Sequence, residues 1–474
     1  MGGQSSGSVD EEQDAESLQA SGGAALGDDY QLTPAFVELV TSAAERGDGP
    51  RLAELIGALR PQDVADLMGF LPAEQRAELV PRFPPDVLAR VLASLDTRIR
   101  EDLLASVAPA TLARALEALQ TDDAAHVVDD LPPARRIDIL EALPLAERAA
   151  IETSLAYPED AAGRLMQREV ALAPQFWTVG QALDHLRVAG GELPELFFDL
   201  YVVDPMMRPV GGVPVSQLLR ANPGTALSDV MKSVTQIPVD MDQEEVAYIF
   251  DKYHLISAPV VEAGGRLVGQ VTVDDVVGVI QHESGEDMLA LANVSDAGRD
   301  ASTAGIVRSR FPWLVVNLVS ETVAVSAIAI FQNEVARIVA LAVLLPIISS
   351  LGNNASVQTL AVAVRSLAAR ELNAANTWRV IRREIAAGLA SGAALSLLMG
   401  IAVVAFYHDW KLALTAGLAL MADIVIAAII GIIAPLALEK LGRDPAVSSP
   451  IIVTFATDFV GFFALLAIAS VIMA

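Results

Sequence analysis

Five long apolar runs near the C-terminal end constrain this chain more than any other feature of its sequence. Each is long enough to cross a bilayer as a helix, because about 20 apolar residues span roughly 30 Å of hydrocarbon. They cover residues 313–331, 338–364, 385–407, 412–438 and 450–473. A content of 53% hydrophobic residues also exceeds that of typical soluble proteins. The sequence therefore predicts a multidomain membrane protein with a five-helix transmembrane α domain over residues 310–474.

The basic residues around these runs indicate their orientation. Nine lie before the first run, between the second and third, or between the fourth and fifth, whereas Arg337 and Lys411 lie in the opposite loops. Positive charge is retained on the cytoplasmic side of membrane proteins. The N-terminus also lacks the basic start and apolar stretch of a signal peptide. We therefore expect a multi-pass protein of the cytoplasmic membrane, with cytoplasmic N-terminal domains and the C-terminus outside.

The region before the apolar runs is strongly acidic. Residues 1–300 carry 50 Asp and Glu against 21 Lys and Arg, and the remaining residues carry 9 against 11. Such a region attracts divalent cations and repels nucleic acid, which we do not expect as a partner. The chain has no cysteine, which excludes disulfides, iron–sulfur clusters and thiolate zinc sites. Because residues 1–30 are rich in Gly, Ser, Asp and Glu, we expect them to form a disordered tail.

A 24-residue period follows this tail. Pro61, Pro85, Pro109 and Pro133 are evenly spaced, and each precedes an apolar stretch. A fixed period is typical of stacked structural units, and further helix-start residues follow about half a period later. The pattern predicts an all-α helical-repeat N-domain over residues 31–150, with two short helices in each unit. Four of its acidic residues either sense ions or form an ordinary solvated face: Asp122, Asp123, Asp129 and Asp130.

Two later stretches resemble each other and predict a duplicated α/β module. Residues 198–219 and 256–277 each read as strand, turn, strand and helix. This pairing resembles tandem CBS domains, which we assign to residues 151–282. The cleft of such domains often binds ATP or another adenine nucleotide, and the resemblance implies contacts from Gly269, Thr272 and Asp275. The first copy departs from this pattern, so that the second copy either holds the nucleotide alone or is a structural hairpin.

An acidic segment connects this module to the membrane domain. Glu283, Glu286 and Asp287 lie three and four residues apart, on one face of a helix expected within residues 283–309. Like charges at this spacing destabilise a helix unless a cation lies between them. The segment is therefore either a metal-sensing latch or an exposed acidic linker.

Polar residues within the apolar runs are costly in lipid and are candidates for the functional site. Asp458 lies in the fifth run, Glu321 in the first and Asp423 in the fourth. Hydrogen bonding between helices is the alternative explanation for Asp458, and interface or capping roles explain Glu321 and Asp423 equally well.

The second run contains the polar sequence LGNNASVQT at residues 351–359 after a proline that frees backbone carbonyls. Magnesium prefers oxygen ligands and retains its waters, so a wide ring of such oxygens suits Mg²⁺. An odd number of spans has no internal two-fold repeat, and we therefore expect a homodimer. The expected pore and ion-binding residues are Pro346, Gly352, Asn354, Gln358, Thr454 and Asp458.

From residue 31 to its end, the chain resembles the MgtE family of magnesium channels and transporters. Members contain a helical N-domain, paired CBS domains, a plug helix and five spans in this order. The stretches that carry the resemblance are 160–166 (DAAGRLM), 242–253 (DQEEVAYIFDKY), 269–277, 352–358 (GNNASVQ) and 444–462. The resemblance implies that Asp458, within T-D-x-x-G, is the central pore residue.

The resemblance also implies regulation by the transported ion. Mg²⁺ bound between the N-domain, the CBS domains and the plug helix closes the pore of family members when cytosolic Mg²⁺ is high. The residues expected to hold regulatory Mg²⁺ here are Asp129, Asp130, Asp242, Glu283, Glu286 and Asp287. The second-run motif departs from the usual G-G-N-A-G-N-Q at Asn353, Ser356 and Val357. Acidic residues common near the plug are also replaced here, by Gly278, Gln281 and His282.

Three other functions compete with Mg²⁺ transport. Transport of Co²⁺, Ni²⁺, Mn²⁺ or Zn²⁺ favours His or thiolate ligands, but only His408 lies near the spans. A membrane-anchored hydrolase needs a motif such as Walker A or H-E-x-x-H, and the chain has neither. A non-conducting Mg²⁺ sensor needs no polar groups within its spans. We therefore predict a Mg²⁺-selective transporter and not an enzyme.

Overall fold

The computed structural model describes residues 25–189, 193–194, 196–292, 294, 303–372 and 376–473. The chain divides into a first unit, Met1–Val279, and a second unit, Ile280–Ala474. Residues 1–24 of the predicted tail lie outside the described residues, whereas Leu26 forms an antiparallel bridge with Leu32. The expected boundary between residues 282 and 283 falls within one continuous helix, α17 (Val273–Leu291).

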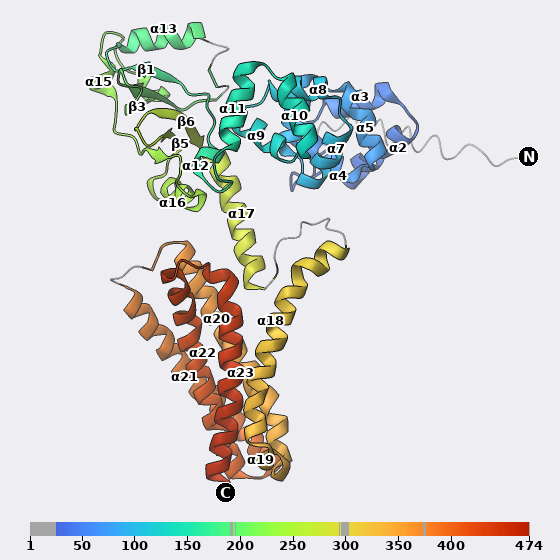
Figure 1. Cartoon of the computed structure of the whole chain (residues 1–474), viewed down its shortest axis with the longest axis vertical. Coiled ribbons are helices and arrows are strands. Elements are labelled where there is room, and N and C mark those ends of the chain that lie inside the picture. The colour runs from blue at the N-terminus through green and yellow to red at the C-terminus, as the bar shows by residue number, and fades with distance from the viewer. Residues whose placement is uncertain are drawn as a thin grey trace, which may run out of the picture. The chain divides into compact units, whose positions relative to one another are not determined.

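The 24-residue period is confirmed as a series of short helices (Figure 1). Four helices begin at the periodic prolines, where the first helical position needs no N–H donor. Their apolar faces form one continuous core from Phe36 to Ile151. The helices are α2 (Pro34–Glu45), α3 (Gly49–Gly57), α4 (Pro61–Phe70), α5 (Ala73–Leu79), α6 (Pro85–Ser94), α7 (Thr97–Ser106), α8 (Pro109–Leu116), α9 (Thr121–Asp129), α10 (Pro133–Ala142) and α11 (Leu145–Leu155), with a 3-10 turn at Val80–Arg82.

Arg100 on α7 is the largest charged side chain in this core, with only 1% of its surface exposed. Its Nε donates to Asp130 Oδ2 at 2.6 Å, and its Nη2 donates to His126 Nε2 at 2.8 Å. These bonds join α7 to α9. Since a buried guanidinium is stable only with all its partners in place, Arg100 fixes the register of the two helices.

The predicted duplication is confirmed as two three-stranded sheets with the orders β1-β2-β3 and β4-β5-β6. In each sheet the first pair is parallel and the second antiparallel. Tyr201 donates a hydrogen bond to Ser257, which donates to Asp199, so that the two sheets are joined. The elements are α12 (Ala162–Leu165), β1 (Leu172–Pro174), α13 (Val179–Ala189), β2 (Asp199–Val203), β3 (Pro209–Pro214), α14 (Val215–Leu218), α15 (Leu227–Val230), β4 (Ile237–Pro238), α16 (Gln243–Tyr253), β5 (Ser257–Val261) and β6 (Leu267–Thr272).

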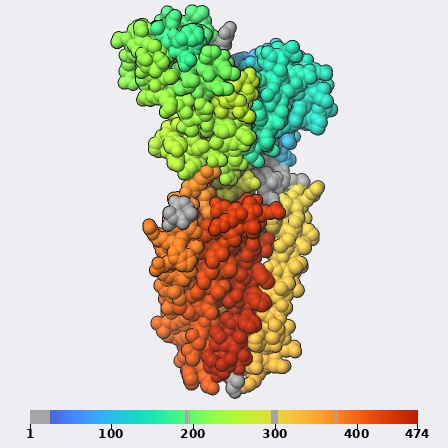
Figure 2. All heavy atoms as spheres, turned by 60° about the vertical axis from the view of Figure 1, so that its left-hand side comes forward, coloured from blue at the N-terminus to red at the C-terminus, as the bar shows by residue number. Residues whose placement is uncertain are grey.

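The second unit contains five helices whose length and apolar composition suffice to cross a membrane, which confirms the five predicted spans. They are α18 (Thr303–Ile330), α20 (Val339–Ala368), α21 (Thr377–Tyr407), α22 (Trp410–Lys440) and α23 (Pro445–Ile472), and a short helix, α19 (Gln332–Arg337), follows the first. Helix α22 packs against α20, α21 and α23, and α18 packs against α23. In the space-filling view of Figure 2, the yellow atoms of α18 lie beside the red atoms of α23.

The buried Arg100 cluster predicts a local stability effect. Replacing Arg100 by Met leaves Asp130 without its cation, which we expect to destabilise α7 and α9 by about 3 kcal/mol. Amide hydrogen exchange of the full-length protein should then become faster in these two helices. Glu101→Gln, at an exposed position on the same helix, should leave exchange unchanged. Equal exchange in the Arg100 variant and wild type would contradict this role.

Candidate ion-binding sites

Asp458 lies where α23 meets α20 and is only 6% exposed. Ser349 on α20 donates a hydrogen bond to its Oδ1 atom. One turn away on both helices, Thr454 Oγ1 donates to Asn353 Oδ1 at 3.2 Å. The spacing of four residues on each helix places both pairs on one line of contact. Asp458 and Thr454 were predicted from the sequence, whereas Ser349, which shares a helical face with Asn353, was not.

Asp423 on α22 approaches the same contact and is fully buried. Neither of its carboxylate oxygens has a hydrogen-bond partner within the described part of the chain. The carboxylate lies directly against Gly352 of α20, where any Cβ would overlap it. A Cβ at Gly461 of α23 would be 3.3 Å from the Asp423 carboxylate. Two glycines on neighbouring helices therefore make the space that Asp423 fills.

A third carboxylate approaches from α18. Glu321 interacts electrostatically with Asp458, and so does Asp423. No basic residue occurs in the apolar parts of the spans, residues 311–336, 338–364, 384–407, 412–439 and 444–473. The three acidic side chains therefore form a cluster that needs protons or cations, because the apolar parts of the spans supply no positive charge.

The other predicted pore residues lie on a different face of α20. Pro346, Asn354 and Gln358 are exposed, as is Ser350. These four residues are each four positions apart, so that they lie along one side of α20, away from Asp458. Of the predicted set, Thr454 thus lies one turn from Asp458 at the contact between α20 and α23, Gly352 lies against Asp423, and the two amides face outward.

The first unit contains a second acidic cluster, between α9 and α17. Burial raises the pKa of Asp122 well above its ordinary value, and the charges of Asp275 and Asp123 raise it further. Burial likewise raises the pKa of Asp275 to about 7, with Asp274 and Asp123 adding to the effect. The Asp122 Oδ1 atom is buried without a hydrogen-bond partner among the described residues. Four carboxylates from two helices therefore face one another without enough positive charge between them.

The regulatory residues predicted within the first unit have protein partners. Asp129 pairs with Arg136 and Arg164, and Asp130 pairs with Arg100. Asp242 caps α16, where it accepts a hydrogen bond from the Glu244 N–H at 2.9 Å. A metal-binding role for these three residues stays a prediction. Asp122 and Asp275 are the better candidates, because neither has a basic partner among the described residues.

The predicted acidic segment Glu283–Asp287 is confirmed as helical, since it lies within α17. In the second unit, Ala290 packs against Ala446 and Val453 of α23. Burial raises the pKa of Asp287, and the nearby Asp444 at the start of α23 raises it further. The end of α17 thus brings acidic side chains to the first turn of the helix that carries Asp458.

The predicted nucleotide contacts also have structural roles. Gly269 in β6 is required by a close approach, because a Cβ there would be 2.6 Å from the Gln167 carbonyl oxygen. Thr272 donates to Asp275 Oδ2 at 2.7 Å. Packing therefore explains all three residues, and the nucleotide site stays a prediction.

The chemistry of both acidic clusters suits a hydrated divalent cation. Among the described residues, no three His, Asp or Glu side chains are arranged to hold a metal ion. Mg²⁺ does not require such a cage, because it retains several waters and is often held by only one or two carboxylates. A site suits Mg²⁺ when it offers carboxylate oxygens that no protein group already occupies, and Asp122 and Asp423 supply such oxygens among the described residues.

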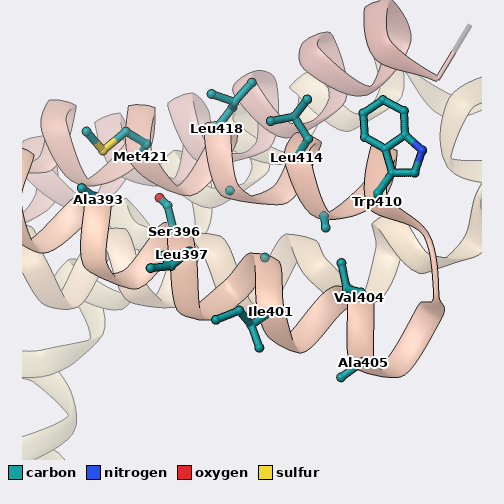
Figure 3. A pocket seen from close by; sticks show the side chains of 13 residues that line it. Ala393, Ser396, Leu397, Ile401, Val404, Ala405, Trp410, Leu414, Leu418 and Met421 are labelled. Carbon is teal, nitrogen blue, oxygen red and sulfur yellow. The ribbon is translucent and has the colours of Figure 1, made fainter.

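A groove of about 910 Å³ between α21 and α22 has a different character. Figure 3 shows Leu397, Ile401 and Leu414 along it, with Trp410 at one end. Its lining contains no carboxylate or amide side chain. The groove therefore offers no ligands for an ion.

Comparison with known proteins identifies the parts of the chain. The profile of MgtE, described as a divalent cation transporter, matches residues 345–468. The MgtE intracellular N domain matches residues 59–160, and the CBS domain matches residues 227–282. The second CBS copy and the helical repeat are thus recognised independently of the spans.

Among solved structures, the cytosolic domain of the Mg²⁺ channel MgtE in complex with ATP is 33% identical, with a TM-score of 0.49. The matched region covers 51% of this chain and 99% of that structure. The soluble part of a magnesium transporter is 26% identical, with a TM-score of 0.48, and covers 52% of this chain and 98% of that structure.

Two relatives are named magnesium transporter MgtE. The protein from Thermus thermophilus is 34% identical over 331 residues, 69% of this chain and 73% of the relative. The protein from Bacillus subtilis is 31% identical over 327 residues, 69% of this chain and 72% of the relative. With this identity across more than two thirds of each chain, the protein belongs to the MgtE family of divalent cation transporters.

Proposed function

We propose that this protein transports Mg²⁺ across the cytoplasmic membrane through a pathway that passes Asp458. The observation that carries the proposal is a buried carboxylate within a span, which accepts a hydrogen bond from Ser349, while the apolar parts of the spans contain no basic residue. A lasting negative charge in hydrocarbon is too costly to persist without a cation. The naming of the Thermus and Bacillus relatives as magnesium transporters supports Mg²⁺ as that cation.

The exposed face of α20 supports the further proposal of a homodimer. Ser350, Asn354 and Gln358 are exposed along a helix that spans the membrane. Polar side chains that face lipid are unfavourable, so that a second copy or a water-filled path must cover them. Two copies related by a two-fold axis satisfy this need and place two Asp458 carboxylates around one pathway. Asn354 and Gln358 then hold the ion through its waters, because Mg²⁺ loses them reluctantly.

Regulation by Mg²⁺ rests on the cluster of Asp122, Asp123, Asp274 and Asp275. With the first unit in the cytoplasm, Mg²⁺ at these residues neutralises the repulsion between α9 and α17. High cytosolic Mg²⁺ therefore stabilises the packed first unit. A second contact, between Asp287 and Asp444, joins the end of α17 to the start of α23. Occupation of both contacts by Mg²⁺ holds α17 against the pore helix and closes the pathway.

The transport proposal predicts that Asp458→Asn abolishes Mg²⁺ uptake. The substitution preserves size and removes the charge that attracts the ion, so that we expect uptake to fall by about 100-fold or more. Uptake is measured in liposomes that contain a magnesium-sensitive dye. Ser470→Ala, on the same helix, should conduct like wild type because its hydroxyl bonds only within the helix. Undiminished uptake by Asp458→Asn would falsify the pathway.

The regulatory proposal predicts that Mg²⁺ protects α9 and α17 from hydrogen exchange in wild type. In the double variant Asp122→Asn, Asp275→Asn, the repulsion is removed, so that protection should be high without Mg²⁺ and change little when it is added. Asp138→Asn, at an exposed site on α10, should respond like wild type. A Mg²⁺ response of wild-type size in the double variant would rule out this cluster as the regulatory site.

The raised pKa values predict a pH effect without Mg²⁺. Asp275 has a folded pKa of about 7, above the unfolded value of about 3.9, so that folding takes up protons between these values. The repulsion between the Asp275 carboxylate and its acidic neighbours is complete above pH 7. It diminishes as the pH falls from 7 toward 4, because Asp275 takes up a proton. We therefore expect amide hydrogen exchange in α9 to become slower as the pH is lowered from 8 to 6, after correction for intrinsic exchange rates. Saturating Mg²⁺ should remove this pH dependence; its persistence would contradict the assignment.

A further inference from the structure

Asp423 is the most deeply buried carboxylate in the membrane-spanning helices. It is fully buried, and both of its oxygens lack a hydrogen-bond partner among the described residues. A buried charge without a partner costs several kcal/mol or more, and a buried neutral carboxyl group still needs hydrogen bonds. Asp423 therefore requires a ligand that the described chain does not supply.

The surroundings of Asp423 indicate the chemistry of that ligand. No basic residue lies in the apolar part of any span, so no cationic side chain from these parts can serve as the partner. The carboxylate rests on Gly352 and Gly461, which have no side chains to offer. Its charge interacts with that of Asp458, which lies one turn from Gly461 on α23. A second negative charge nearby increases the need for a cation.

The oxygens available at this place match a divalent cation. Asp458 receives the Ser349 hydrogen bond on Oδ1, and Asp423 has both oxygens free. Two carboxylates and retained waters satisfy Mg²⁺, whereas a monovalent cation would leave one negative charge uncompensated. Glu321 of α18 also interacts with Asp458 and is a third acidic group near this place.

We propose that Asp423 and Asp458 together bind one divalent cation, at a site between α20, α22 and α23 in which Asp423 is an ion ligand. This inference deepens the proposed Mg²⁺ transport and rests on it for the biological identity of the ion. The site places a carboxylate of α22 on a pathway otherwise formed by α20 and α23. Gly352 and Gly461 serve it by admitting the Asp423 side chain between the helices.

The test counts bound Mn²⁺ on the purified full-length protein, with Mn²⁺ as a paramagnetic probe whose free signal is measured. Wild type is compared with Asp423→Asn, Asp458→Asn and the double variant. We expect each single variant to lose the same portion of bound Mn²⁺, or to bind it about tenfold or more weakly, and the double variant to lose no more. Mn²⁺ bound at sites in the first unit is the same in all four proteins, so it does not affect the differences between them.

Thr415→Val is the matched control, because Thr415 is also fully buried on α22 and bonds only to the Lys411 carbonyl of its own helix. It should bind Mn²⁺ like wild type, and all variants should elute as the same species. Full Mn²⁺ binding by Asp423→Asn would overturn the inference and indicate that Asp423 is a neutral carboxyl group, which asparagine imitates. Additive losses in the double variant would also overturn it, because they indicate two separate ions.

Uptake separates this inference from the transport proposal. A shared loss of Mn²⁺ with undiminished uptake by Asp458→Asn supports the site and contradicts the pathway. Uptake that depends on Asp458 together with full Mn²⁺ binding by Asp423→Asn supports the pathway and contradicts the site.

Discussion

Negative charge without a basic partner is the constraint on which both units of this protein depend. Two kinds of carboxylate occur in it. Asp129 and Asp130 are paired with arginines and hold the helical repeat together. Among the described residues, the Asp122 Oδ1 atom and both carboxylate oxygens of Asp423 have no hydrogen-bond partner, although each is shielded from water. Because the second kind is stable only with a proton or a cation, the fold itself creates a demand for cations at both places.

The arrangement of elements was largely predictable from the sequence, since local patterns determine it. The five spans follow from apolar length, and the short helices follow from prolines at a fixed period. The bounds were less accurate, because hydropathy detects only the part of a helix that suits lipid. Helix α18 begins at Thr303, ten residues before the apolar run that predicted it. Helix α17 crosses the expected boundary at residue 282 and ends at Leu291, within the connecting helix expected over residues 283–309.

The partners of the charged residues could not be predicted, because they depend on contacts between distant segments. Asp122 and Asp275 are far apart in sequence, and nothing local distinguishes them from Asp129 or Asp130, which are paired with arginines. Asp423 was recognised as costly, but its lack of any partner requires knowledge of the neighbouring helices. Sequence identifies residues that need a partner, and only the packed helices identify the residues that lack one.

The altered motif of α20 illustrates how packing absorbs a change at a functional site. Asn353 replaces a glycine and accepts a hydrogen bond from Thr454, and Ser356 replaces another and donates to the Asn353 carbonyl oxygen. The Asn353 side-chain oxygen is thereby satisfied between α20 and α23, and the Ser356 hydroxyl is satisfied within α20. Gly352 tolerates no such change, because Asp423 occupies the space of its side chain. The motif is thus free to vary where a hydrogen bond can form, and it is fixed where a carboxylate must approach the backbone.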